Sequence, residues 1–172
     1  DRRGASHSIG AEGVRRAVLG GVDTVEHAYN IDEPTLDLIL ERGLSIVPTL
    51  RIMHKGLSPW GEQTSRDQFR SLKKAYEAGA KIALGTDSTG SRHFVNGPGN
   101  AVECALMSQV MPAADVLVSA TRGAAQALGI VDEVGSIEAG KHADIIAVRE
   151  DPRANIGTLQ HVAFVMRGGE VV

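Results

Sequence analysis

The feature of this sequence that most constrains its fold is a repeated unit: a helix-like segment, a glycine, a short apolar run and a closing polar residue. The unit occurs three times between residues 10 and 87. The glycines are Gly21, Gly43 and Gly79, and the closing residues are His27, Thr49 and Asp87. Helices that alternate with strands favour a parallel sheet. The pattern therefore predicts an α/β fold, either part of a (β/α) barrel or an open parallel sheet.

Three polar residues of this pattern predict a metal site for hydrolysis. An earlier apolar run ends at His7, so His7, His27 and Asp87 each follow a predicted strand. The carboxyl ends of parallel strands meet on one face of such a fold. Zinc binds imidazole nitrogen and carboxylate oxygen, and it lowers the pKa of a bound water to about 7. The Asp87 carboxylate could take a proton from that water and pass it to a leaving group.

Each of these residues also has a structural interpretation. A lone histidine at a strand end is more often a hydrogen-bonded structural residue, and Asp87 could cap the turn formed by residues 85–88. Glu26 is expected on the opposite face of its strand from His27, as a packing or salt-bridging residue. The shared placement at strand ends is what favours the metal site.

Further patterns predict the remaining elements. Asp32 is a suitable N-cap, and Ser65 with Gln68 fits a capping box at the start of a helix. Beyond a glycine-rich loop at 89–99, the composition changes near Ile130. We expect two parts, residues 1–130 and 131–172, the second built of short strands. Predicted helices cover 10–19, 101–110 and 112–128, and predicted strands cover 22–28, 44–50, 81–87, 134–137, 143–148 and 162–166.

Composition narrows the partners and the compartment. The net charge is -3 and only 3% of residues are aromatic, so neither a nucleic acid nor an anionic membrane is an expected partner. No apolar run approaches the roughly 18 residues that span a bilayer. The single cysteine cannot form an internal disulfide, which fits a reducing compartment. We expect a cytoplasmic protein.

Several stretches together resemble one known family. They are SHSIGAEGVRRAVLGGVDTVEHA at 6–28, VPTL at 47–50, LGTDS at 84–88, and the tail segments GSIEAGKHADIIAVREDP at 135–152 and VMRGGEVV at 165–172. In this order they resemble the amidohydrolase superfamily, specifically its imidazolonepropionase-like and Xaa-Pro-dipeptidase-like branch. The resemblance covers essentially the whole chain.

The resemblance implies a fold and a set of site residues. The family fold is a (β/α)8 barrel with a small β-sandwich built from both chain ends. By this likeness, His7 and His27 are metal ligands from strands five and six, and Asp87 is the strand-eight aspartate, which binds metal and shuttles protons. The residues implied to face substrate are Tyr29, Asn30, Thr49 and His93.

Departures from the family pattern imply an incomplete barrel. The strand-one His-x-His pair and the strand-four lysine of the family are missing, so the chain is expected to hold only strands five to eight and the C-terminal strands of the sandwich. The implied activity is metal-dependent hydrolysis of a C–N bond in a dipeptide, an N-acyl amino acid or a cyclic amide. The implied cofactor is one or two divalent ions, zinc above all.

Two partners would complete such a half-barrel. The absent N-terminal half would restore the catalytic site, and we expect the isolated chain to have little activity without it. Alternatively, the chain is a non-catalytic half-barrel module that self-associates, because four unclosed parallel strands leave two edges and an apolar face to be covered.

Overall fold

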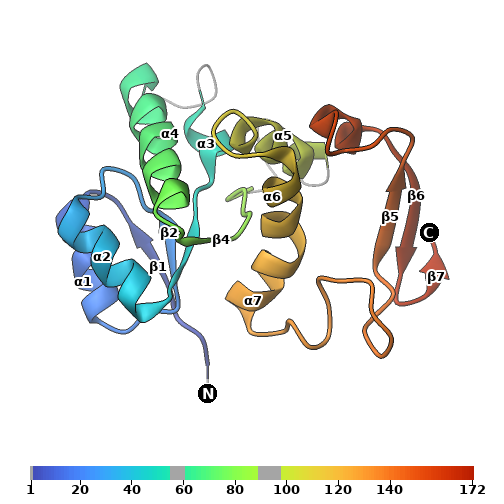
Figure 1. Ribbon diagram of the computed structural model, residues 1–172, viewed down its shortest axis with the longest axis horizontal. Helices are drawn as coiled ribbons and strands as arrows, with labels where there is room; N and C mark the ends of the chain where they lie inside the picture. Colours follow the sequence, from blue (N-terminus) through green and yellow to red (C-terminus); the bar gives the residue numbers. More distant parts are fainter. Residues whose placement is uncertain (1, 55–60, 89–97) are drawn as a thin grey trace.

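A four-stranded parallel sheet forms the first part of the chain, as the repeat predicts (Figure 1). The computed structural model describes residues 2–54, 61–88 and 98–172. The strands lie in sequence order, and each pairs in parallel with the next. They are β1 (Ala5–Ser8), β2 (Thr24–His27), β3 (Ser45–Val47) and β4 (Lys81–Ile82).

Capping residues set the ends of the second helix between these strands. The Asp32 side chain accepts a hydrogen bond from the Thr35 backbone N–H at 2.9 Å, which confirms the predicted N-cap. Gly43 ends the same helix with φ 64°, a left-handed conformation that glycine adopts without steric cost. The helices of this part are α1 (Ala11–Leu19), α2 (Glu33–Arg42), α3 (Leu50–Met53) and α4 (Gly61–Glu77).

The main core lies between these helices and one face of the sheet. Val25 and Ile46 point to this face, where they pack with Val14, Val18 and Ile39. All five side chains are almost fully buried. The opposite face of the sheet carries Thr24, Glu26 and Val47, because side chains alternate along a strand.

Four further helical segments follow, and the last of them closes part of that opposite face. Val47 and Ala83 pack there against Ala127. Gly123 allows a close approach, since a Cβ at this position would lie 2.7 Å from the carbonyl oxygen of Ile82. The segments are α5 (Pro98–Met107), α6 (Ala113–Val118), the π-helical η1 (Ser119–Gly123) and α7 (Ala124–Leu128).

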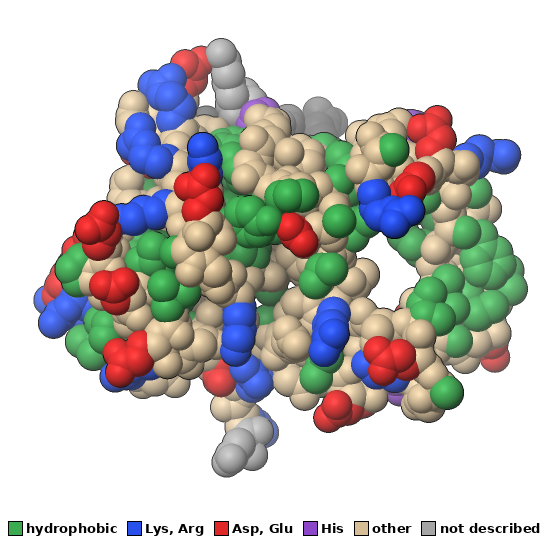
Figure 2. Space-filling view, viewed as in Figure 1, with side chains coloured by type: hydrophobic (Ala, Val, Ile, Leu, Met, Phe, Trp, Pro, Cys, Tyr) green, Lys and Arg blue, Asp and Glu red, His purple; other side chains and the backbone are tan. Residues whose placement is uncertain are grey.

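A second, antiparallel sheet stands beside this unit (Figure 1). The 3-10 helix η2 (Ile156–Gln160) packs against α5 and joins the two parts. The strands of the second sheet are β5 (Ile145–Val148), β6 (Val162–Arg167) and β7 (Glu170–Val171). Hydrophobic side chains gather over it in Figure 2. Ile146 and Val165, which pair across β5 and β6, are exposed hydrophobic residues of this sheet.

Some predicted elements are wrong. Residues 134–137 form a bend and irregular chain, not a strand, because Gly135 takes a φ of 95° and packs against the helix at Ala125. Ser65 and Gln68 lie inside α4, which starts at Gly61, so they form no capping box. The observed parallel strands are also shorter than predicted, since β3 ends at Val47 and β4 at Ile82. None of the helices in the described part has the length and apolar character that a membrane crossing requires.

Candidate metal centre

Two histidine rings from neighbouring parallel strands face each other at the carboxyl end of the sheet. His7 lies on β1 and His27 is the last residue of β2. His7 Nδ1 and His27 Nε2 are 2.7 Å apart, and the ring centroids are 4.4 Å apart at an interplanar angle of 71°. The two nitrogens are within hydrogen-bond distance of each other, and imidazole nitrogen is a donor type that suits a divalent cation.

This contact requires a departure from regular strand geometry. The parallel register pairs His7 with Glu26 and Ser8 with His27, so a regular β2 would place the two rings on opposite faces. His27 has φ 70° and Ala28 has φ 47°, both left-handed. The turn redirects the His27 ring toward His7.

Left-handed backbone follows three of the four parallel strands near this centre. In residues 2–54, 61–88 and 98–172, non-glycine residues with positive φ occur only at the ends of β2 and β3 and shortly after β4. Such conformations cost on the order of 1–3 kcal/mol each and cluster at functional sites. They are His27, Ala28, Asn30, Thr49 and Asp87.

The environment of His27 favours the neutral form of its ring and holds the ring in place. The side chain is buried, with 5% exposed. Burial lowers its pKa, the neighbouring His7 lowers it further, and the charge of Asp87 acts in the opposite direction. The other ring nitrogen, Nδ1, lies 2.7 Å from Thr49 Oγ1. A neutral imidazole is the form that binds metal.

Asp87 lies near the histidine pair but is not packed against it. Its side chain is exposed, and its charge acts on both His27 and Glu26. No group of three His, Cys, Asp or Glu side chains within the described ranges is close enough to hold a metal ion. Within the described residues the centre therefore offers two imidazole donors, with Asp87 as a neighbouring carboxylate outside direct contact.

Glu26 lines a cavity on the sheet face opposite the main core. It shares this cavity with Thr24, Val47 and Ala83, and its carboxylate accepts a hydrogen bond from the Thr24 hydroxyl at 2.7 Å. Register puts it on the same face as His7. Burial raises the pKa of Glu26, and Asp87 raises it further, against the lowering effect of the Thr24 bond.

The residues expected to face substrate are scattered around the pair. Asn30 is exposed, and its backbone N–H donates to Ser71 Oγ at 2.8 Å. Tyr29 is half-buried, with its pKa raised by burial and by the charge of Asp67. Thr49 is only 2% exposed. His93 lies outside the described residues.

Sequence reasoning missed a buried carboxylate behind the centre. Glu103, on α5, is fully buried, and its two oxygens accept hydrogen bonds from the backbone N–H groups of Leu50 and Arg51, each at 2.7 Å. The Arg51 guanidinium donates to Ser88 Oγ at 3.0 Å. One signal was available, since Glu103 is the lone charge in the apolar helix segment at 101–107.

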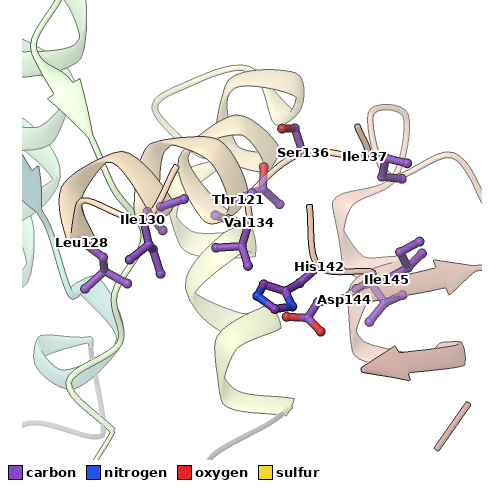
Figure 3. Close-up of a pocket in the computed structure, with 14 residues that line it drawn as sticks. Thr121, Leu128, Ile130, Val134, Ser136, Ile137, His142, Asp144 and Ile145 are labelled. Carbon is purple, nitrogen blue, oxygen red and sulfur yellow. The ribbon is translucent and has the colours of Figure 1, made fainter. Parts of the chain in front are cut away.

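A separate pocket lies between α7 and β5 (Figure 3). Its volume is about 550 Å³, and its lining is mainly apolar, with His142 and Asp144 on one wall. Asp144 accepts a hydrogen bond from the Gly168 backbone N–H at 2.7 Å, which assigns it to the turn after β6. None of the predicted site residues lines this pocket.

Comparison with known sequences places this geometry in context. The model of the amidohydrolase family matches residues 5–172. Ochratoxinase from Aspergillus niger is 28% identical over 97% of this chain and 37% of its own length. A 5-methylthioadenosine/S-adenosylhomocysteine deaminase from Syntrophobacter fumaroxidans is 30% identical over 90% of this chain and 35% of its own.

Solved structures show the same arrangement of the chain. A Xaa-Pro dipeptidase crystallised with bound methionine matches with a TM-score of 0.84 and 35% identity, over 98% of this chain and 44% of its own. The structure of A. niger ochratoxinase matches with a TM-score of 0.86 and 26% identity, over 99% and 41%. The chain therefore spans less than half the length of each of these relatives.

Proposed function

Because the chain belongs to the amidohydrolase family, we propose that it supplies one half of a metal-dependent enzyme that hydrolyses C–N bonds. His7 and His27 would hold a divalent cation, with zinc as the first candidate. The observation that carries the proposal is the pair of facing nitrogens, His7 Nδ1 and His27 Nε2, on adjacent parallel strands. A single histidine at a strand end is weak support for a metal site. Two rings held in contact by strained backbone are stronger support, because such strain clusters at functional sites.

The residues of this chain divide the chemistry among them. When bound, a divalent cation polarises a carbonyl group and lowers the pKa of water to about 7. The neutral His27 ring, kept so by burial, presents a nitrogen lone pair to it. Asp87, exposed beside the pair, would accept a proton at its carboxylate and return it to the departing amine.

We propose that the substrate of the complete enzyme is an amide. The resemblance to a Xaa-Pro dipeptidase and to ochratoxinase supports a dipeptide or an N-acyl amino acid as substrate, with a cyclic amide as a further option. We propose that Tyr29, Asn30 and His93 contribute to the substrate pocket, since the first two follow His27 within three residues.

The barrel is part of the same proposal. Strands β1 to β4 would be its second half, residues 131–172 would belong to a sandwich domain, and an N-terminal half would complete both. Full activity then requires that half.

Zinc titration of the metal-free chain by calorimetry tests the proposal. We expect one site that involves both histidines, so His7→Ala and His27→Ala should each weaken zinc binding at least tenfold. His161→Ala, which changes an exposed histidine of the second part, is the matched control and should bind zinc as the wild type does. Zinc binding that survives both site substitutions would contradict the proposal.

A second candidate is a half-barrel module that self-associates. It is favoured by the exposed pair Ile146 and Val165, 53% and 39% exposed, which lie opposite each other on the small sheet. An apolar patch of this kind on a sheet face is typical of an interaction surface. In this alternative, the second copy covers the patch and the histidine pair is structural.

A further inference from the structure

The hydroxyl of Thr49 determines which nitrogen of His27 carries a proton. Thr49 Oγ1 lies 2.8 Å from the carbonyl oxygen of Pro48 and 2.7 Å from His27 Nδ1. A carbonyl oxygen only accepts, so the single hydroxyl proton is donated to Pro48. Thr49 Oγ1 must then accept from His27, and Nδ1 of the neutral ring carries the proton.

This tautomer leaves the correct nitrogen bare. With Nδ1 protonated, Nε2 of His27 keeps its lone pair and points at His7. In the metal-free chain it accepts a hydrogen bond from His7 Nδ1. A cation that replaces this proton finds the His27 lone pair already in place, which is how a second partner tunes a metal-binding histidine.

Thr49 needs external support to hold this position. It is β-branched and has φ 48°, a left-handed conformation that such residues rarely adopt. The next two backbone N–H groups, of Leu50 and Arg51, are both bound by the buried carboxylate of Glu103. Glu103, which lies on α5, therefore holds the backbone in place directly after Thr49.

The turn after β3 also contacts the segment that carries Asp87. Arg51 is buried, and its guanidinium donates to Ser88, the residue after Asp87. Gly99 makes room for this guanidinium, because a Cβ there would overlap it. One buried carboxylate thus organises the turn that contacts both His27 and the Asp87 segment.

We propose that Thr49 and Glu103 are positioning residues of the metal centre, with Glu103 holding the turn after β3 and Thr49 setting the His27 tautomer. This inference rests on the proposed function, and it assigns Thr49 to the support of His27, which agrees with its 2% exposure. Neither residue is required to touch the substrate.

The test is the protonation pattern of the His27 ring in the metal-free, 15N-labelled chain at pH 8, read from long-range proton–nitrogen correlation spectra. We expect a protonated Nδ1 and a bare Nε2 in the wild type. Thr49→Val removes the acceptor, so the proton should move to Nε2, and Thr49→Ser should restore the wild-type pattern. Zinc affinity measured on the same variants should fall about 10- to 100-fold for Thr49→Val and little for Thr49→Ser.

Glu103 is tested through its coupling to Thr49. Glu103→Gln keeps one acceptor oxygen of two, so we expect it to weaken zinc binding and to give a mixture of His27 tautomers. If Glu103 acts through Thr49, the double variant with Thr49→Val should bind zinc about as well as Thr49→Val alone. Tyr76→Phe, which removes a hydrogen bond to Asp115 on α6, is the matched control and should change stability but not the His27 spectrum. If Glu103→Gln does not fold, the comparison of Thr49→Val with Thr49→Ser still tests the role of Thr49.

The outcomes separate this inference from the proposed function. A His27 tautomer that is unchanged in Thr49→Val overturns the inference, even if the wild type binds zinc. Losses of zinc affinity that simply multiply in the double variant overturn the role of Glu103. A tautomer that responds to Thr49→Val in a chain with no zinc affinity supports the positioning of His27 and refutes the metal-dependent function.

Discussion

At the scale of single residues, the site depends on groups held in unfavourable states by their neighbours. His27 and Thr49 have left-handed backbone, and Glu103 is a carboxylate without exposed surface. A native structure tolerates such states only where packing and hydrogen bonds over-determine them. Their concentration around two facing imidazoles is the strongest residue-level argument for function.

Glu103 gives the chain a specific pH dependence of stability. Burial raises its pKa to about 7, although two backbone hydrogen bonds and Arg51 lower it. Between the ordinary carboxyl pKa and 7, the folded state binds more protons than the unfolded state, so this group's contribution to stability falls as pH rises. As the pH rises from 5 to 8, we expect the contribution of Glu103 to the free energy of unfolding to fall by about 2–3 kcal/mol.

The comparison of wild type with Glu103→Gln isolates this effect. The free energy of unfolding, from urea titrations at pH 5 and pH 8, should favour the wild type over the variant more strongly at pH 5. Other titrating groups cancel in the difference. A difference between the two proteins that is constant with pH, or that grows toward pH 8, would show that Glu103 is ionised throughout.

At the scale of elements, the approach to Asp87 is set by the packing of β3 against the segment after β4. A Cβ built at Gly85 would overlap Cγ1 of Val47, whose β-branched side chain has little freedom to move. Gly85→Ala should therefore destabilise the fold by about 1–3 kcal/mol, the usual cost of overpacking.

Two matched variants sharpen this test in thermal or urea unfolding. Val47→Ala in the Gly85→Ala background removes the overlapping methyl group and should recover part of the loss. Gly13→Ala, on α1 with open space around its Cβ, should be neutral or stabilising by up to about 1 kcal/mol. If Gly85→Ala were as stable as Gly13→Ala, Val47 would not set the position of this segment.

The same scale shows what the sequence could predict. Glycine and N-cap signals are local, so Asp32 and Gly43 predicted the ends of α2 correctly. The predicted strand at 134–137 was wrong because two apolar residues in a short segment cannot show that Gly135 packs against a helix. The role of Glu103 was not predictable, since its two partners are more than 50 residues away in the sequence. The placement of His7 and His27 at the same end of the sheet followed from parallel topology, but the turn that brings their rings into contact did not.

At the scale of the whole molecule, the chain has surfaces that its described residues do not cover. Strands β1 and β4 each pair on one side only among the described strands, and β5 and β6 expose Ile146 and Val165. The chain spans 44% of the matched Xaa-Pro dipeptidase. An N-terminal half or a second copy of the chain would cover these surfaces.

We expect the isolated chain to self-associate through the small sheet. Sedimentation velocity should show a concentration-dependent shift to larger species, and Ile146→Lys should reduce it. Ile137→Lys, at a residue that is 84% exposed and outside the sheet, is the matched control and should leave association unchanged. A monomer at all concentrations, or equal effects of both variants, would contradict the role of this face.

The most direct test of the central claim is a crystal structure of the chain grown with zinc, with anomalous scattering measured at the zinc edge. The account predicts a zinc peak between the two rings, with His7 Nδ1 and His27 Nε2 each about 2.0–2.1 Å from the ion. A structure in which excess zinc binds elsewhere while these two nitrogens remain hydrogen-bonded to each other would contradict it.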